Sequence, residues 1–277
     1  MIEAKLSLVL PAHNEQANLA YVIEHAVDEI PQFFRTFEVI IVNDGSYDRT
    51  GEIADLLARQ CPSITVVHHG RNRGYGSALR SGFAASSGDW VMVMDSDRQF
   101  DLGDLVYLAP FIGEYDLVAG YRMRRSDPIH RVVFGKIFKV AVGVMFGLRL
   151  RDIDCAFKVI RGDLLRRIEL TSPGALVSTE LMAKWVRVGG TWTEVGVNHY
   201  PRSAGEQSGG SFRVIFRAMK EIIVLRYRLD REPAETTRYG SAGYPRGVSI
   251  GRVGLLAGIA ALVTGIGGRL LRSNRKK

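Results

Sequence analysis

A short apolar run leads directly into an acidic loop in Asp89-Trp90-Val91-Met92-Val93-Met94-Asp95-Ser96-Asp97-Arg98-Gln99. The apolar residues follow a glycine and include β-branched valines, a pattern that predicts a short buried strand. Two carboxylates and an amide then arrive where this strand ends. Because open α/β sheets bind ligands beyond the carboxyl ends of their strands, the run predicts a binding site at one edge of such a sheet.

Asp95, Asp97 and Gln99 place oxygen atoms at positions i, i+2 and i+4 of the loop. In a sheet covered by helices, an acidic pair is costly to bury unless a positive charge neutralises it. Hard oxygen donors suit Mg²⁺ or Mn²⁺, which commonly take one or two carboxylates and complete their coordination with phosphate oxygens and water. We therefore expect a Mg²⁺ or Mn²⁺ site that carries a diphosphate. The alternative, that Asp97 or Asp101 merely caps a helix beginning near Leu102, stays open at this point.

Predicted strands and helices alternate through the first part of the chain. The strands are expected at 5–10, 37–42, 64–67 and 89–94, and the helices at 18–30, 50–60 and 74–86. Such alternation is typical of a right-handed, mostly parallel α/β sheet. Polar residues follow the first two strands as well, with Asn14 and Glu15 in one loop and Asn43 and Asp44 in the other. Each of them is also a common turn residue, but parallel strands bring all these loops to one edge.

The composition is that of an ordinary globular protein with an excess of positive charge. The chain has 277 residues, of which 46% are hydrophobic and 24% charged, with a net charge of +8;. The basic runs at 122–125 and 269–277 favour an anionic partner such as a phosphate or a membrane surface;. No nucleic-acid motif accompanies them, so nucleic acid is the least expected partner. Cys61 and Cys155 form no disulfide or metal pattern, and no signal peptide is expected, which fits a reducing cytosolic environment;.

Four motifs in a fixed order give the chain a family resemblance. They are Leu8-Val9-Leu10-Pro11-Ala12-His13-Asn14-Glu15, Val42-Asn43-Asp44-Gly45-Ser46, Asn72-x-Gly74-Tyr75-Gly76, and Asp95-x-Asp97-x-Gln99. This set resembles the family 2 inverting glycosyltransferases, in particular the branch of dolichol-phosphate mannosyltransferase and other polyprenyl-phosphate glycosyltransferases. The resemblance covers about residues 5–230. It implies a GT-A type fold, a Rossmann-like, mostly parallel sheet with flanking helices.

The resemblance also implies roles for individual residues. Carried over by position, the nucleotide-sugar pocket would be lined by Pro11, Asn14, Glu15, Asp44 and Asp95. The metal and the diphosphate would be held by Asp95, Asp97 and Gln99. Two positions depart from the family pattern, because Asn43 stands where an aspartate is frequent and Arg98 adds a cation within reach of a phosphate.

Further motifs of the family follow in the second half of the chain. Arg122 lies in a segment that resembles the family's Gly-Ser-Arg element, and Asp152 begins one that resembles its acceptor motif. Lys158 replaces the arginine of that motif, which keeps the charge but loses the two-pronged geometry. Arg202 opens a segment similar to the loop that covers the diphosphate. Glu180 either matches a family glutamate or belongs to a helix cap, and both interpretations stay open.

Three segments predict contact with a membrane. The apolar helix expected at 130–150 is either a core helix or an interfacial helix with snorkelling basic residues, and the basic cluster before it favours the second;. The helix expected at 212–229 is amphipathic. The apolar run 253–268 has only 16 residues, fewer than the roughly 20 that a span requires;. A single span extended to residue 271 and a surface-bound segment both remain open, since the basic tail runs against the positive-inside tendency.

These observations predict the organisation of the chain. We expect a GT-A domain over 1–229, divided into a nucleotide-sugar half at 1–120 and an acceptor half at 121–229, then a linker at 230–247, a membrane-associated hydrophobic segment at 248–271 and a basic tail at 272–277. The protein would act at the cytoplasmic face of a membrane.

The expected reaction moves a hexose, mannose or glucose, from GDP-mannose or UDP-glucose to a polyprenyl phosphate with inversion. A phosphate monoester, with a second pKa of about 6, is already ionised near neutral pH and needs positioning more than deprotonation. Arg122 and Arg131 would hold this phosphate, and Asp152 would orient the attack. The metal and Arg202 would neutralise the departing diphosphate.

Three other functions are weighed against this one. A related enzyme that glycosylates a sugar or glycolipid hydroxyl would need Asp152 as a general base. A sugar nucleotidyltransferase would open with a glycine-rich loop after the first strand, and 11–15 contains no glycine. A membrane-bound binding protein without activity would have little use for the complete set of predicted metal ligands.

Overall fold

A computed structural model describes residues 1–123, 129–202 and 212–231, and at 129–137 and 212–220 it describes the helical backbone without the side chains. The strands are β1 (Ile2–Ala12), β2 (Phe34–Asn43), β3 (Ile64–His68), β4 (Trp90–Val93), β5 (Leu117–Arg122), β6 (Lys158–Arg161) and β7 (Trp192–Val197). The α-helices are α1 (Leu19–Glu29), α2 (Thr50–Gln60), α3 (Tyr75–Ala85), α4 (Leu105–Leu108), α5 (Ile129–Phe146), α6 (Gly162–Leu165), α7 (Val177–Arg187) and α8 (Phe212–Arg231). Short 3₁₀ turns are η1 (Ile30–Gln32), η2 (Leu102–Asp104) and η3 (Ala109–Phe111).

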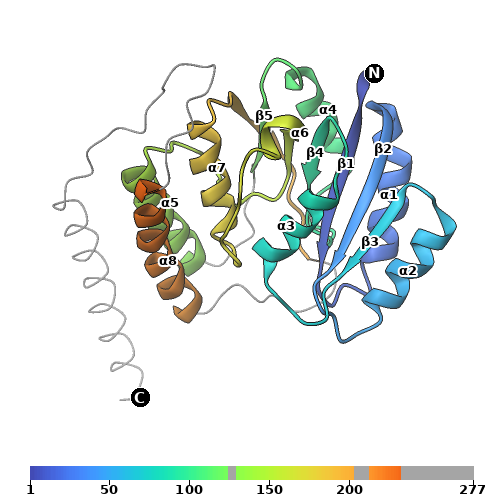
Figure 1. Cartoon of the computed structure of the whole chain (residues 1–277), viewed down its shortest axis with the longest axis horizontal. Coiled ribbons are helices and arrows are strands. Elements are labelled where there is room, and N and C mark those ends of the chain that lie inside the picture. Colours follow the sequence, from blue (N-terminus) through green and yellow to red (C-terminus); the bar gives the residue numbers. More distant parts are fainter. Residues whose placement is uncertain (124–128, 203–211, 232–277) are drawn as a thin grey trace.

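The strands form one seven-stranded sheet in the order β3-β2-β1-β4-β6-β5-β7 (Figure 1). β3, β2, β1 and β4 are parallel, and β7 is parallel to β5. β6 alone among the described strands runs antiparallel, to both β4 and β5. The sequence prediction of a mostly parallel sheet is therefore confirmed. The strand order reverses between β1 and β4, which is the place where doubly wound sheets bind their ligands.

The sheet divides the apolar core into two layers. Along β1, Val9 faces one layer while Leu8 and Leu10 face the other, as the alternation of a strand requires;. Helices α1, α2 and α4 contribute to the layer that contains Leu8, and α3, α5, α7 and α8 contribute to the layer that contains Val9. Strands buried on both faces read as continuous apolar runs, which explains why these strands were visible in the sequence.

Several element boundaries differ from the sequence prediction. β1 begins at Ile2 and not at residue 5, because its first residues pair with β2 although they are half-exposed and form no apolar run. The helix expected near Leu102 begins as the 3₁₀ turn η2, with Asp101 accepting a hydrogen bond from the Gly103 amide. The long apolar helix ends at Phe146 and not at 150. Gly147, with φ of +69°, terminates it by donating to the Gly143 carbonyl;.

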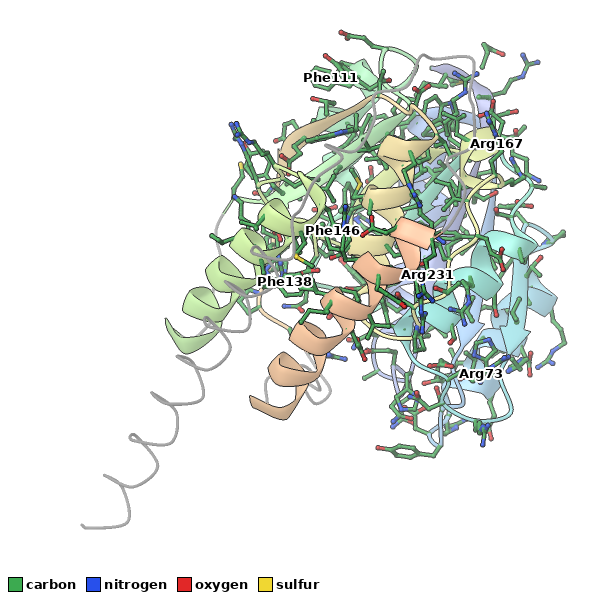
Figure 2. All side chains as sticks on the ribbon, turned by 60° about the vertical axis from the view of Figure 1, so that its left-hand side comes forward. Arg73, Phe111, Phe138, Phe146, Arg167 and Arg231 are labelled. Atoms are coloured by element: carbon green, nitrogen blue, oxygen red, sulfur yellow. The ribbon has the colours of Figure 1, made fainter. Side chains whose placement is uncertain are left out.

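Helices α5 and α8 lie side by side at the end of the molecule beyond α7 (Figures 1 and 2). Figure 2 labels Phe138 and Phe146 on α5 and Arg231 at the C-terminal end of α8. The core interpretation of α5 holds for one side of the helix, and its interfacial interpretation stays a prediction. Residues Ala141, Val142, Met145 and Phe146 are buried, whereas Val140 is 59% exposed. On α8, Ile222, Leu225 and Leu229 are buried and Ile223, Val224 and Tyr227 are exposed.

Among the described residues, no helix combines the length and the apolar character that a membrane crossing needs. Helix α8 extends to Arg231, so the first two residues of the linker predicted at 230–247 are helical. The rest of the predicted linker, the hydrophobic segment at 248–271 and the basic tail lie outside the described residues.

Candidate active site

The carboxyl ends of β1, β2 and β4 lie beside one another at one edge of the sheet, as the sequence predicts. Ser96, in the acidic loop after β4, donates to the Pro11 carbonyl in β1 over 2.9 Å. His13 Nδ1, after β1, lies 3.0 Å from the Asp44 carbonyl, after β2. The three loops are thus joined, and the residues predicted for the nucleotide sugar and for the metal lie at one place.

Two of these acidic side chains are bridged by an arginine from the far end of the chain. Arg202 pairs with the Glu15 carboxylate, and its Nη1 lies 3.8 Å from Asp97 Oδ2. Glu15 and Asp97 are only 7% and 8% exposed. Burial raises the pKa of both carboxyl groups, and the charge of Arg202 opposes this rise. The structure therefore places Arg202 against the predicted metal site, although 187 residues separate it from Glu15 in the sequence.

Asp95 is surrounded by groups of both charges. The Tyr75 hydroxyl, at the start of α3, donates a hydrogen bond to its carboxylate. Burial and the neighbouring charge of Asp97 raise the pKa of Asp95 to about 7, although Tyr75 and the positive charges of Lys158 and Arg122 work in the opposite direction. Two carboxylates that repel each other in this way, Asp95 half-buried and Asp97 buried, have the chemistry of a site for a hard cation;.

Lys158, at the start of β6, donates its ammonium protons to the carbonyls of Ile153 and Cys155. A lysine fits this arrangement because a compact ammonium can serve backbone carbonyls, whereas a planar guanidinium would need more room. Burial raises the pKa of the Cys155 thiol to about 11. This cysteine is therefore a packing residue and not a nucleophile.

The remaining residues of the acidic loop are tied to other segments. Gln99 donates from its side-chain amide to the Tyr200 carbonyl over 3.1 Å, and from its backbone to Asp97 Oδ1 over 3.1 Å. The guanidinium of Arg98 lies 3.8 Å from the centre of the Tyr21 ring on α1. That Arg98 could reach a phosphate stays a prediction. The capping interpretation applies to Asp101 and not to Asp97, because Asp101 alone accepts from η2.

Asp44 lies at the predicted place, but three donors occupy its carboxylate. His69 Nδ1 lies 2.6 Å from Oδ1, and the amides of Arg73 and Gly74 donate to the two oxygens over 2.9 Å each. His69 Nε2 continues to the Ser81 hydroxyl over 2.8 Å. The side chain of Asp44 therefore holds the loop that leads into α3.

The loops after β1 and β2 also hold each other. Asn14 has a φ of +59°, and its side-chain oxygen accepts from the backbone amide of Tyr47 over 3.0 Å. The backbone amide of Asn14 donates to the Ser46 hydroxyl. Asn43 accepts from the Ser46 amide and lies 3.0 Å from His68 Nδ1. The Asn43 amide can donate to that imidazole, whereas an aspartate could contact it only through a proton on His68 Nδ1;. The departure from the family pattern thus has a local structural reason.

Arg122 and Asp152, predicted as separate functional residues, form one ion pair. Arg122 Nε lies 2.6 Å from Oδ2 and its Nη2 lies 2.9 Å from Oδ1, an arrangement with two parallel hydrogen bonds;. Asp152 is 6% exposed, and its backbone amide donates to Glu194 on β7. The pair fixes the orientation of the guanidinium beside Asp95. Arg131 lies in α5, and its side chain is outside the described part of the chain.

Glu180 is fully buried within α7 and does not cap it. Its carboxylate accepts from the amides of Thr171 and Ser172 and from the Thr171 hydroxyl, and lies 3.2 Å from Lys184 Nζ. The segment held in this way packs against the start of α3, where the Gly76 amide donates to the Pro173 carbonyl over 2.8 Å. A Cβ atom at position 76 would lie 2.1 Å from the Ser172 carbonyl oxygen. Glu180 therefore supports the end of α3 that carries Tyr75.

A model of the glycosyl transferase family 2 matches residues 7–168, which include the joined strand ends, the acidic pair and Asp152. The chain belongs to glycosyl transferase family 2. The resemblance to this family that the ordered motifs indicate is therefore confirmed. The chain is a glycosyltransferase.

Two curated relatives of this glycosyltransferase are similar over most of its length. The dodecaprenyl-phosphate galacturonate synthase of Rhizobium johnstonii is 26% identical over 238 residues, covering 81% of this chain and 68% of its own. The undecaprenyl-phosphate 4-deoxy-4-formamido-L-arabinose transferase of Pseudomonas aeruginosa is 26% identical over 212 residues, covering 76% and 62%. The glycosyltransferase thus spans about two thirds of the length of these relatives.

A solved structure supports the same fold. The glucosyl-3-phosphoglycerate synthase of Mycobacterium tuberculosis, crystallised with Mn²⁺, UDP-glucose and phosphoglyceric acid, has a TM-score of 0.56 and 25% identity. The match covers 79% of the glycosyltransferase and 80% of the mycobacterial chain. The mixed, mostly parallel sheet with flanking helices is therefore GT-A-like.

The raised pKa of Asp95 predicts how the stability of the metal-free glycosyltransferase varies with pH. An unfolded aspartate ionises near pH 4, whereas folded Asp95 keeps its proton up to about pH 7;. The folded state binds the additional proton between these values, so the free energy of unfolding falls as the pH rises from about 4 to about 7. We expect thermal unfolding in chelator to occur at a higher temperature at about pH 5.5 than at about pH 7.5. Asp95→Asn should flatten this dependence, and a wild-type transition that rises with pH over the same window would contradict the assignment.

Proposed function

We propose that this glycosyltransferase transfers a sugar from a nucleotide diphosphate sugar to a polyprenyl phosphate, with inversion, at the cytoplasmic face of a membrane. The observation that carries the proposal is the acidic pair Asp95 and Asp97 beside an arginine, Arg122, that a second carboxylate holds in a fixed orientation. The acidic pair suits a cation that carries a diphosphate, and the oriented arginine suits a phosphate monoester. The names of the two curated relatives, both polyprenyl-phosphate sugar transferases, support the same acceptor.

Asp95 and Asp97 would hold Mg²⁺ or Mn²⁺, with the Gln99 amide oxygen as a further donor. The two carboxylates fit such an ion because burial disfavours the charged form of both, and the charge of Asp97 further disfavours that of Asp95, until a cation neutralises them;. When bound, the ion would stabilise the negative charge that develops on the leaving diphosphate. The Mn²⁺ and UDP-glucose in the mycobacterial structure support this part of the proposal. Pro11, Asn14, Glu15 and Asp44 would line the pocket for the nucleotide sugar.

Arg122 would bind the acceptor phosphate, together with Arg131. The phosphate is ionised near neutral pH, so its oxygen can attack the anomeric carbon without a general base. The Asp152 carboxylate is engaged in two hydrogen bonds with Arg122, which suits a residue that orients the guanidinium. Arg202, placed between Glu15 and Asp97, would add a positive charge on the side of the leaving group;.

A transfer assay tests the proposal. Membrane fractions containing the full chain would receive polyprenyl phosphate, Mn²⁺ or Mg²⁺, and radiolabelled UDP-glucose or GDP-mannose, with a chelator as the control. We propose a hexose, mannose or glucose, as the sugar, and labelled lipid that is released by mild acid is the expected product. Other nucleotide sugars extend the panel, because the relatives carry galacturonate and a modified arabinose in their names. Donor consumption without labelled lipid would contradict the acceptor and favour transfer to a hydroxyl.

A further inference from the structure

Arg98, between two of the proposed metal ligands, has an unusual backbone conformation. Its φ is +63°, and among the described residues other than glycine only Asn14 shares a positive φ. Asparagine tolerates this region because its short polar side chain can bond locally, whereas a long side chain there costs free energy. A glycine would avoid the cost. The conformation of Arg98 therefore needs an interaction that offsets the strain, and such outliers cluster at functional sites.

That interaction comes from α1. The guanidinium of Arg98 lies 3.8 Å from the centre of the Tyr21 ring, within the range of a cation–π contact;. The Tyr21 ring is also stacked against His25, with centroids 5.9 Å apart and planes 28° apart. His25 Nε2 in turn lies 2.9 Å from Asp101 Oδ1. The series Arg98, Tyr21, His25 and Asp101 thus fastens both halves of the acidic loop to one helix.

The contact has a consequence for the neighbours of Arg98. The Gln99 amide donates to Asp97 Oδ1, so the turn at Arg98 also determines how the Asp97 carboxylate is held. Gln99 itself is anchored to Tyr200 on its other side. A loop fixed in this way needs no reordering when a cation binds, and preorganisation of this kind is a direct contribution to affinity.

We propose that Tyr21, supported by His25, is a positioning residue that holds Arg98 in its left-handed conformation and thereby fixes Asp97 and Gln99 for a divalent cation. This inference rests on the proposed metal site, and Tyr21 acts in it through Arg98 and not as a ligand. Tyr21 is 48% exposed and would otherwise pass for a surface residue.

The test compares Tyr21→Ala with Tyr21→Phe and with a matched control on α8. Tyr227 is 55% exposed and its ring carries an equivalent contact, with Arg231 3.9 Å from its centre. Two quantities are measured on the full chain: hydrogen exchange of the 95–101 backbone without metal, and the Kd of Mn²⁺ in the presence of UDP or GDP. We expect Tyr21→Ala to speed exchange in the loop and to weaken Mn²⁺ binding about three- to tenfold. Tyr21→Phe and Tyr227→Ala should match the wild type in both.

A second variant, Arg98→Gly, removes the backbone strain that the contact with Tyr21 offsets. Arg98→Gly adopts the left-handed conformation without strain, so Tyr21→Ala should change loop exchange less in this background than in the wild type. Unchanged exchange and Mn²⁺ affinity in Tyr21→Ala, or equal changes in Tyr227→Ala, would overturn the proposal. Because exchange is measured without metal or lipid, its result stands apart from the transfer assay, whose failure would contradict the proposed function alone.

Discussion

Replacing Asp97 with asparagine is expected to lower sugar transfer by about 10³-fold while leaving the protein at least as stable as before. Removing one group that stabilises developing charge typically lowers kcat by about 10²- to 10³-fold. Loss of a metal ligand is expected at the upper end of this range. Stability should respond in the opposite way. Burial raises the pKa of Asp97, which means that the fold disfavours its charged form at neutral pH;. A neutral side chain of the same shape relieves this penalty and the repulsion of Asp95.

The measurement pairs initial transfer rates with thermal unfolding in chelator. Asp163→Asn is the matched control, because its carboxylate is 63% exposed and binds neighbouring surface groups away from the site. The control should keep wild-type transfer. If Asp97→Asn retained more than about a tenth of the activity, or if it unfolded several degrees lower in chelator, then Asp97 would be a structural residue and the metal assignment would be wrong.

The sequence predicts the parts of the site that lie at strand ends. Apolar runs located β1, β2, β3 and β4, and parallel pairing then required their polar loops to meet, as they do around Glu15, Asp44 and Asp97. The local pattern suffices here because a strand that is buried on both faces has an uninterrupted run of apolar residues. The same argument could not reveal that the Asp44 carboxylate is occupied by the loop before α3. That depends on a pairing with His69, 25 residues away.

The site residues that follow β4 were less predictable for a physical reason. Arg122 and Asp152 are 30 residues apart, and the sequence predicts a separate role for each, but the antiparallel return of β6 between β4 and β5 brings them into one ion pair. A strand of four residues gives no signal for its direction. The role of Glu180 could not be predicted from its local sequence either. Its position near a helix start suggested a cap, and only its complete burial and the segment at 171–173 reveal a support for α3.

Arg122→Lys is expected to lower transfer by about 10²- to 10³-fold, mainly through a higher KM for the lipid phosphate. The Arg122 guanidinium makes two parallel hydrogen bonds to Asp152 and has further N–H groups for a phosphate. A lysine keeps the charge but cannot make this pair of contacts. Asp152→Asn should lower transfer only about tenfold, since the amide keeps one acceptor for Arg122 and an ionised phosphate needs no base. The KM for the donor should stay unchanged in both variants.

The inequality between these two variants decides which acceptor the enzyme uses. With a phosphate acceptor, the arginine matters more than the carboxylate, because binding and orientation of the nucleophile limit the reaction. With a hydroxyl acceptor, a proton must leave during the attack, and the carboxylate would then matter more. The kinetics of both variants against polyprenyl phosphate, together with thermal unfolding to confirm that each is folded, separate the cases. A larger loss of kcat in Asp152→Asn than in Arg122→Lys, with residual turnover that gives an unchanged KM for the acceptor, would reverse the assignment and make Asp152 the general base, because a positioning role changes acceptor binding before it changes the chemical step.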